Sequence, residues 1–280
     1  MILYWDILKL LLNTRSIKVL LGACVFSMAF SMAVILCAIG IMNGYEDSLL
    51  NFSKSGNGEI FMHPINGFLS QEEANLINLV DKKNIKEVSK IRQIEAFIMN
   101  ENTAQGILVK GIDPHFFSVT QISFALQKND IALSAKLAQK LNLKIGEEVA
   151  ISFAKGNEQF SELPTTYRVR LKSIINHGIY EKDMRYVYMN EASLFSLLGI
   201  APHYNLFEIK IAGNDFSKAK ILQQVDRLNK RYGDSFFVYP FWHSYKNVLE
   251  AVEVEKFIIA VILQIIVVVS IFNIVAFIYY

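Results

Sequence analysis

Two long hydrophobic stretches without a single charge stand near the two ends of the chain. They cover Val19–Met42 and Phe257–Tyr280, and each is 24 residues long. A helix of about 20 apolar residues crosses the hydrocarbon core of a bilayer, which is about 30 Å thick. Each stretch therefore predicts one transmembrane helix, and we place these two helices at residues 17–44 and 257–280.

Both predicted helices continue beyond their apolar stretches. Helical periodicity persists through Tyr45–Lys54 and stops at the helix-breaking sequence Ser55-Gly56-Asn57-Gly58. Near the other end, an apolar stripe runs through Ser244–Lys256 into the second stretch, with no glycine or proline between them. We therefore expect both helices to project from the membrane as stalks, a geometry that suits the transmission of motion.

Between the stalks, short strand patterns alternate with short amphipathic helices. Runs of alternating or clustered hydrophobic residues predict strands at Glu59–His63, Val88–Met99, Gln105–Val109, Ile131–Leu133, Val149–Phe153, Tyr167–Asn176, Met184–Met189, Leu206–Ile211 and Phe236–Tyr239. Ser70 and Glu73 form a capping box that predicts a helix start, and Ser134 is expected to cap a second helix. Further helices are predicted at Glu191–Leu198 and Phe216–Arg231. Residues 45–256 thus predict an α+β domain with two lobes.

The distribution of charge predicts the orientation in the membrane. Residues 1–16 predict an amphipathic leader, and Lys9, Arg15 and Lys18 precede the first span, whereas Glu46 and Asp47 follow it. Basic flanks stay in the cytoplasm, so we expect a cytoplasmic N-terminus and an extracytoplasmic middle domain. In a Gram-negative bacterium that domain is periplasmic, and the protein lies in the inner membrane. The first stretch is longer than the roughly 7–15 apolar residues of a cleaved signal peptide, so we expect it to be a transmembrane helix or signal anchor instead.

Composition excludes several classes of protein. Of the 280 residues, 52% are hydrophobic and 19% are charged, and the mean hydropathy is +0.30. This excludes a soluble enzyme, a disulfide-rich secreted scaffold and a disordered chain. Residues 45–256 carry 25 basic and 25 acidic side chains, so no basic field favours nucleic acid. Cys24 and Cys37 both lie in the first stretch, about 20 Å apart along a helix, and cannot bridge each other.

No constellation of catalytic residues emerges from the sequence. The five histidines are dispersed, and the chain has neither a phosphate-binding glycine loop nor a nucleophile elbow. We therefore expect no catalytic residue, no metal site and no cofactor. Gln264 and Asn273 are polar positions in the second span and are expected to face another helix.

Several motifs, in order, resemble the permease subunits of the lipoprotein-releasing (Lol) ABC transporter, of the LolC/LolE type within the MacB/FtsX-like superfamily. The matching segments are Ile41–Glu46, Val109–Pro114, Ile131–Val149, Gly178–Asp183 and Leu249–Ile274. The resemblance covers nearly all of the chain. Its most specific parts are the Asn-Gly-aromatic-Glu sequence after the first span and the final segment, which contains Val254-Glu255-Lys256. Family members carry two further membrane helices, so the chain is expected to correspond to the N-terminal portion of such a permease.

The resemblance implies a mechanical role in a larger assembly. The expected partners are an ABC ATPase subunit, a second permease that is identical or related, a lipoprotein substrate, a periplasmic lipoprotein carrier and membrane lipid. ATP hydrolysis belongs to the separate ATPase, so this chain is expected to be non-catalytic.

In the family, a hairpin loop of the periplasmic domain catches the carrier. The matching interval here is Ala154–Thr166, with Phe160, Leu163 and Pro164 as its apolar side chains. A lipoprotein enters between membrane helices, where Phe26, Phe30, Ile41, Phe257, Val261, Gln264 and Asn273 are the candidate contacts.

Three other functions stay open on topology alone. A regulator of cell-wall hydrolases that resembles FtsX shares the same layout. A two-helix transmembrane sensor or receptor also fits, although it needs a cytoplasmic output module. A membrane-anchored enzyme is the third alternative, and the absence of a recognisable site argues against it.

Overall fold

The structure, a computed structural model, describes residues 15–54, 56–77, 84–100, 103–120, 122–153, 165–213 and 217–279. The chain forms two compact units. The first, which we call the helical unit, comprises residues 15–49 and 245–279. The second, which we call the domain, comprises Leu50–Ser244.

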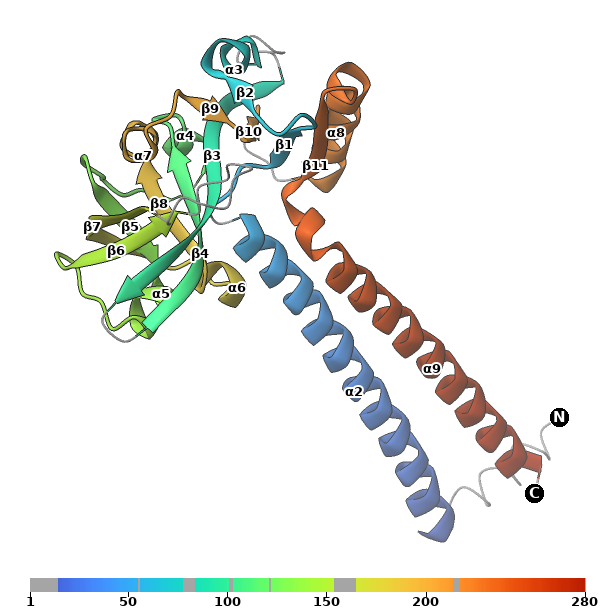
Figure 1. The fold of residues 1–280 in the computed structure, drawn as a ribbon. Coiled ribbons are helices and arrows are strands. Elements are labelled where there is room, and N and C mark those ends of the chain that lie inside the picture. Colours follow the sequence, from blue (N-terminus) through green and yellow to red (C-terminus); the bar gives the residue numbers. More distant parts are fainter. Residues whose placement is uncertain are drawn as a thin grey trace. The chain divides into compact units, whose positions relative to one another are not determined.

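Two long helices build the helical unit, α2 (Arg15–Lys54) and α9 (Lys246–Tyr279), with a short 3-10 turn η1 (Phe241–Tyr245) before α9 (Figure 1). At 1.5 Å per residue, the 40 residues of α2 span about 60 Å, roughly twice the thickness of the hydrocarbon core. Both helices are long and apolar enough to cross a membrane. These bounds confirm that each predicted span continues without a break into a longer helix, and the position of the membrane along it stays a prediction.

The domain is built from eleven strands and six short helices among its described residues. The strands are β1 (Ile60–Pro64), β2 (Leu69–Ser70), β3 (Ile85–Asn100), β4 (Thr103–Ile112), β5 (Asp130–Ser134), β6 (Glu148–Phe153), β7 (Thr165–Ile175), β8 (Tyr186–Asn190), β9 (His203–Tyr204), β10 (Leu206–Ile211) and β11 (Phe236–Pro240). The helices are α3 (Gln71–Ile77), α4 (Phe116–Val119), α5 (Ala135–Lys140), α6 (Tyr180–Asp183), α7 (Glu191–Leu198) and α8 (Lys218–Tyr232).

The long strand β3 belongs to both lobes of the domain. Strand β4 pairs along one edge of β3, while β10 and then β6 pair along its other edge. Six strands in the order β3-β4-β8-β5-β7-β6 return to β3 and close a barrel. The remaining strands extend the sheet from β3 through β10 and β1 to β11. The two lobes therefore share the continuous strand β3, so a displacement of β3 reaches both lobes.

Each lobe has its own hydrophobic core. Inside the barrel, side chains such as Ile98, Val109 and Leu133 are fully or almost fully buried. The second core lies between the β11-β1-β10-β3 sheet and its helices, where Phe207, Ile221 and Met62 pack together. The predicted two-lobed α+β architecture is confirmed.

Most predicted elements agree with the structure to within a few residues, and the capping box is present. The Ser70 N–H donates to Glu73 Oε2 at 2.9 Å, and the Glu73 N–H donates to Ser70 Oγ at 3.3 Å. Two predictions were wrong in detail. Ser134 precedes α5, but its hydroxyl donates to the Tyr186 carbonyl at 2.9 Å instead of capping the helix. Met184 ends α6 instead of starting a strand, because its N–H continues the helical turn to Tyr180.

Candidate functional site

The polypeptide passes from α2 into β1 through a turn at Gly56, Asn57 and Gly58, packed too tightly for side chains at its glycines. Gly56 has φ +74°, and a Cβ there would lie 2.6 Å from Ile122 Cδ1 and 3.0 Å from the His177 ring. A Cβ on Gly58 would lie 2.9 Å from the Ile209 backbone nitrogen. The turn that follows α2 is thus held directly against β10 and against the segment that follows β7.

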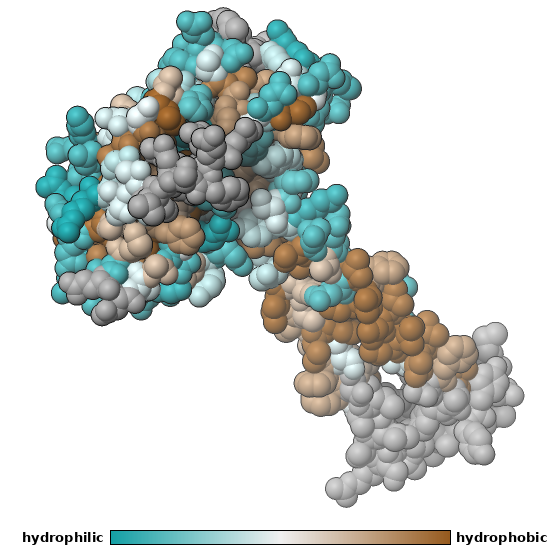
Figure 2. Space-filling view, viewed as in Figure 1, coloured by the Kyte–Doolittle hydropathy of each residue, from teal (hydrophilic) through white to brown (hydrophobic). Residues whose placement is uncertain are grey.

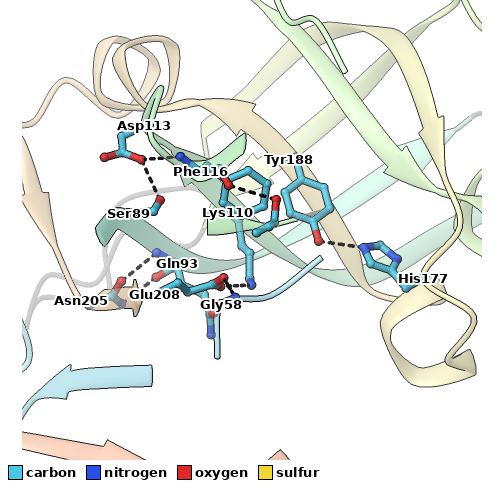
Figure 3. A network of polar contacts seen from close by, with 11 residues as sticks. Gly58, Ser89, Gln93, Lys110, Asp113, Phe116, His177, Tyr188, Asn205 and Glu208 are labelled. Carbon is cyan, nitrogen blue, oxygen red and sulfur yellow. Dashed lines mark hydrogen bonds and ion pairs between the residues drawn. The ribbon is translucent and has the colours of Figure 1, made fainter. Parts of the chain in front are cut away.

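This turn is hydrogen-bonded to a buried ion pair. Lys110 Nζ, on β4, lies 2.8 Å from Glu208 Oε1, on β10, and the two side chains are 2% and 0% exposed. The Gly58 N–H donates to the other carboxylate oxygen of Glu208 at 2.7 Å (Figure 3). One carboxylate therefore joins the turn, β10 and β4.

Electrostatics favours the charged state of this pair. Burial alone would lower the pKa of Lys110, but the attraction of Glu208, helped by Tyr186, outweighs it and the net pKa is raised. The ammonium also lies 4.9 Å from the centre of the Tyr186 ring. An ion pair removed from water this completely is strongly sensitive to the loss of either partner.

A second carboxylate fastens the last turn of α2. Glu59 Oε1 lies 3.3 Å from Lys54 Nζ and 3.1 Å from Lys210 Nζ. The Ile211 N–H donates to Glu59 Oε2 at 2.9 Å. Glu59 consequently ties the end of α2 to β10, and Glu208 ties the turn that follows α2 to the same strand.

A second buried group of hydrogen-bonded polar side chains, His177, Asp183 and Tyr188, lies in the same domain. His177 Nδ1 lies 2.8 Å from Asp183 Oδ1, and His177 Nε2 lies 2.8 Å from the Tyr188 hydroxyl. His177 and Tyr188 are 1% and 0% exposed. Burial lowers the pKa of His177, and its hydrogen bond to Asp183 opposes that shift only in part. An Asp-His-Tyr arrangement sealed from solvent cannot meet a substrate, so we interpret it as structural.

One further cation borders the network. Lys182, on α6, is 5% exposed, and its pKa is lowered to about 7 because burial removes its hydration and Lys110 repels it. Within the described ranges, no group of three or more His, Cys, Asp or Glu side chains is placed to hold a metal ion. The network as a whole joins β4, β8, β10 and α6.

In the helical unit, α2 and α9 are joined by an ion pair and enclose an apolar cavity. Lys256 Nζ, on α9, lies 2.6 Å from Glu46 Oε2, on α2, and the two side chains are only 24% and 19% exposed. A cavity of about 360 Å³ lies between the two helices. Its walls are almost wholly apolar and are formed by Val25, Met28, Ala29, Ser31, Met32, Ile35, Leu263, Ile266, Val267 and Ser270. Figure 2 shows apolar surface along this part of the helices and polar surface over much of the domain.

The residues predicted to contact a lipoprotein do not line that cavity. They lie on exposed faces: Phe26 and Phe30 stack with ring centroids 6.3 Å apart, and Ile41, Phe257, Val261 and Gln264 are exposed as well. Asn273 lies in α9, and its side chain is outside the described residues. The role of these positions stays a prediction.

The predicted carrier loop falls largely outside the described residues. Phe160, Leu163 and Pro164 lie in the interval 154–164, which the structure does not describe. The strands on either side, β6 and β7, pair antiparallel up to Phe153 and Thr165, as a hairpin requires.

Sequence reasoning missed the buried network. His177-Gly178 reads as an ordinary turn, and Lys110 and Glu208 are 98 positions apart. A usable signal was present, because each of the two charged residues interrupts a short run of apolar strand residues.

Comparison with known proteins adds an independent observation. Residues 22–213 match the family model described as the MacB-like periplasmic core domain. The chain is 20% identical over 268 residues to the lipoprotein-releasing system transmembrane protein LolC of Neisseria meningitidis serogroup B. That alignment covers 89% of this chain and 62% of the relative, so the chain spans less than two thirds of that protein's length.

Two solved structures are similar in part. The periplasmic region of MacB from Actinobacillus actinomycetemcomitans is 15% identical, with a TM-score of 0.46 over 73% of this chain and 98% of that one. The extracellular domain of the ABC-type transporter YknZ from Gram-positive bacteria is 17% identical, with a TM-score of 0.43 over 65% and 99% of the two chains. The family model matches well over half of the sequence, and the chain therefore belongs to the MacB-like periplasmic core domain family, whose members are membrane subunits of ABC-type permeases.

Proposed function

We propose that this chain is a permease subunit of an ABC transporter that extracts lipoproteins from the inner membrane and passes them to a periplasmic carrier. The observation that carries the proposal is the similarity to the LolC protein along 89% of the chain. In this assembly the chain works with an ABC ATPase and with a second permease. The N-terminus lies in the cytoplasm and the domain in the periplasm.

The polar network supports a mechanical role for α2. Residues 15–54 form one uninterrupted helix, so an axial displacement at one end reaches the other. In the turn that follows α2, the Gly58 N–H donates to Glu208, which is paired to Lys110. Because separating a buried ion pair is costly, the attachment transmits force instead of yielding. The motion then enters β10 and β4, which lie on opposite edges of β3.

The carrier would be held by the β6–β7 loop, Ala154–Thr166. Exposed apolar side chains on a polar loop are suitable anchors for a partner, and Phe160, Leu163 and Pro164 supply them. The lipid chains of the substrate would contact the exposed apolar faces of the two helices, at Phe26, Phe30, Ile41, Phe257 and Val261, with Gln264 and Asn273 facing a further helix.

Photo-cross-linking in cells tests this proposal. A benzophenone amino acid at position 160 of the full chain should capture a soluble periplasmic carrier, and one at position 26 should capture a lipoprotein. Leu222, on α8, is 50% exposed and serves as the control position, which should capture neither. Capture of a cell-wall hydrolase at position 160 would favour an FtsX-like regulator and contradict the proposal.

A double substitution tests the loop separately. Changing Phe160 and Leu163 to Asp removes both apolar anchors and adds two charges, so co-purification of the carrier should fall at least tenfold. Unchanged co-purification would eliminate this loop as the carrier site, even if lipoproteins are still captured at position 26.

A further inference from the structure

One buried cation in the domain lacks an ion-pair partner among the described residues. Arg92, on β3, is 7% exposed, and its Nε and Nη1 atoms are buried without a hydrogen-bond acceptor. No carboxylate in the described part of the chain forms an ion pair with it. An arginine keeps its charge at any physiological pH, although burial lowers its pKa. Buried charges in folded proteins are normally paired, so this guanidinium requires an explanation.

Two other buried cations of the domain, Lys110 and Lys90, show what is missing. Lys110 has Glu208 at 2.8 Å. Lys90, two residues before Arg92 on the same strand, donates to Asn75 Oδ1 at 2.9 Å. Arg92 has only an aromatic ring, since the Phe68 ring centre lies 4.0 Å from its guanidinium carbon. A ring face offsets only part of the lost hydration of a cation and leaves its in-plane N–H donors unused.

Phe68 covers the guanidinium from a turn that is largely open to solvent. Its side chain is 48% exposed, and Ile65, three residues earlier, is 43% exposed. Between them, Gly67 has φ +88°, and its N–H donates to the Pro64 carbonyl at 3.2 Å, which closes the turn. The ring that lies against the guanidinium is therefore half-exposed, and a second exposed apolar side chain stands three residues earlier in the same turn.

We propose that Arg92, beneath Phe68, is a binding site for the carboxylate side chain of a protein segment that docks on this turn. The planar guanidinium matches a carboxylate in geometry and charge. Phe68 moves aside to admit the acid, and together with Ile65 it contacts an apolar residue next to that acid. The site is formed by β3 and the turn before β2, not by the β6–β7 loop, and does not depend on lipoprotein transport.

Thermal unfolding of the full chain in detergent tests the site. Acetate, compared with chloride at equal ionic strength, should raise the Tm of the wild type by about 2–4 °C as it binds the folded state. In Arg92→Met this acetate effect should vanish. Because the substitution removes an unpaired buried charge, Arg92→Met should itself unfold about 2–4 °C higher in chloride. Failure of the variant to fold, or a lower Tm, would show that Arg92 is only structural and overturn the proposal.

The matched control is Arg231→Met. Arg231 also lies over an aromatic ring, 5.4 Å from the Tyr232 centroid, but it is exposed, so its replacement should leave the acetate effect unchanged. An acetate effect that persists in Arg92→Met would refute the site. Stabilisation by inorganic phosphate without any by acetate would refute the carboxylate assignment.

A peptide distinguishes a protein ligand from a free carboxylate. Acetyl-Leu-Glu-Leu amide should bind the wild type at least tenfold more tightly than acetate, because it adds apolar contacts to Phe68 and Ile65. In Phe68→Ala that tenfold advantage should disappear, while acetate binding remains. Equal binding of peptide and acetate to the wild type would contradict a protein ligand.

Discussion

Replacing Lys110 by methionine tests the contribution of the buried ion pair independently of the other features of the domain. Methionine keeps most of the length of the lysine chain and removes its charge. Glu208 then stays buried, with the Gly58 N–H donor at 2.7 Å but without its counter-ion. The variant therefore tests whether this pair holds the two lobes and the α2–β1 turn together.

The structure sets the size of the effect. At a separation of 2.8 Å and an effective dielectric constant of about 20, the attraction between two unit charges is about 6 kcal/mol. Part of it is offset by the hydration that both groups lose on burial. Breaking such a pair by removing one partner typically costs about 3–5 kcal/mol. For a domain of this size, that corresponds to a fall in Tm on the order of 10 °C.

Denaturation of the full chain in mild detergent, followed by far-UV circular dichroism, measures this loss. The double variant Lys110→Met with Glu208→Met should recover most of the stability, because apolar replacement of both partners leaves no buried charge. Arg185→Met is the matched control. The Arg185–Glu95 pair is 3.4 Å apart but 53% and 82% exposed, so its loss should cost less than about 1 kcal/mol. If Lys110→Met were as mild as this control, the reasoning about the buried network would be refuted.

Three further predictions concern the turn, the pH response and the helical unit. Gly58→Ala should destabilise the chain by about 2 kcal/mol or more because its Cβ meets backbone at 2.9 Å, whereas Gly106→Ala, with its nearest neighbour at 4.0 Å, should be neutral or slightly stabilising in the same unfolding assay. Burial lowers the pKa of Lys182 in the folded state to about 7, below its ordinary value of 10.5, so the unfolded chain binds this proton more tightly. Burying the charged Lys182 therefore destabilises the fold fully below pH 7, and stability should rise between about pH 7 and 10. Lys182→Met should flatten this rise in Tm with pH, and an unchanged slope would assign the rise to other groups. Glu46→Lys and Lys256→Glu should each weaken the pairing of α2 with α9 and lower Tm, and the double exchange should restore it; if the double exchange were no better than the singles, the 2.6 Å contact would not stabilise the helix pair.

The elements that local pattern determines were predictable. Two charge-free stretches and their uninterrupted periodicity predict α2 and α9 almost to the residue. Ser70 and Glu73 predict the start of α3, since a capping box is completed within four residues. Elements of four residues or fewer, such as α4 and α6, went unpredicted, because so short a segment carries no measurable period.

Long-range contacts were not predictable from the sequence alone. Gly58 and Glu208 are 150 positions apart, and Lys110 and Glu208 are 98 apart, so no local spacing reveals that they meet. His177 looks like a turn residue because glycine follows it, yet it is almost completely buried. Arg92 reads as one more charge on a strand, and only packing shows that its partner is an aromatic ring.

The sequence by itself determined where the chain can cross a membrane and where the two long helices stop. It also determined that residues 45–256 carry equal numbers of acidic and basic side chains. These properties follow from the residue order within one or two helical turns and from composition. The tertiary structure decided that β3 serves both lobes and that one carboxylate joins the turn after α2 to β4 and β10. It also decided that, among the described residues, one guanidinium has no counter-ion. These depend on which strands become neighbours, and strand pairing is fixed by cooperative burial of two cores rather than by any local signal.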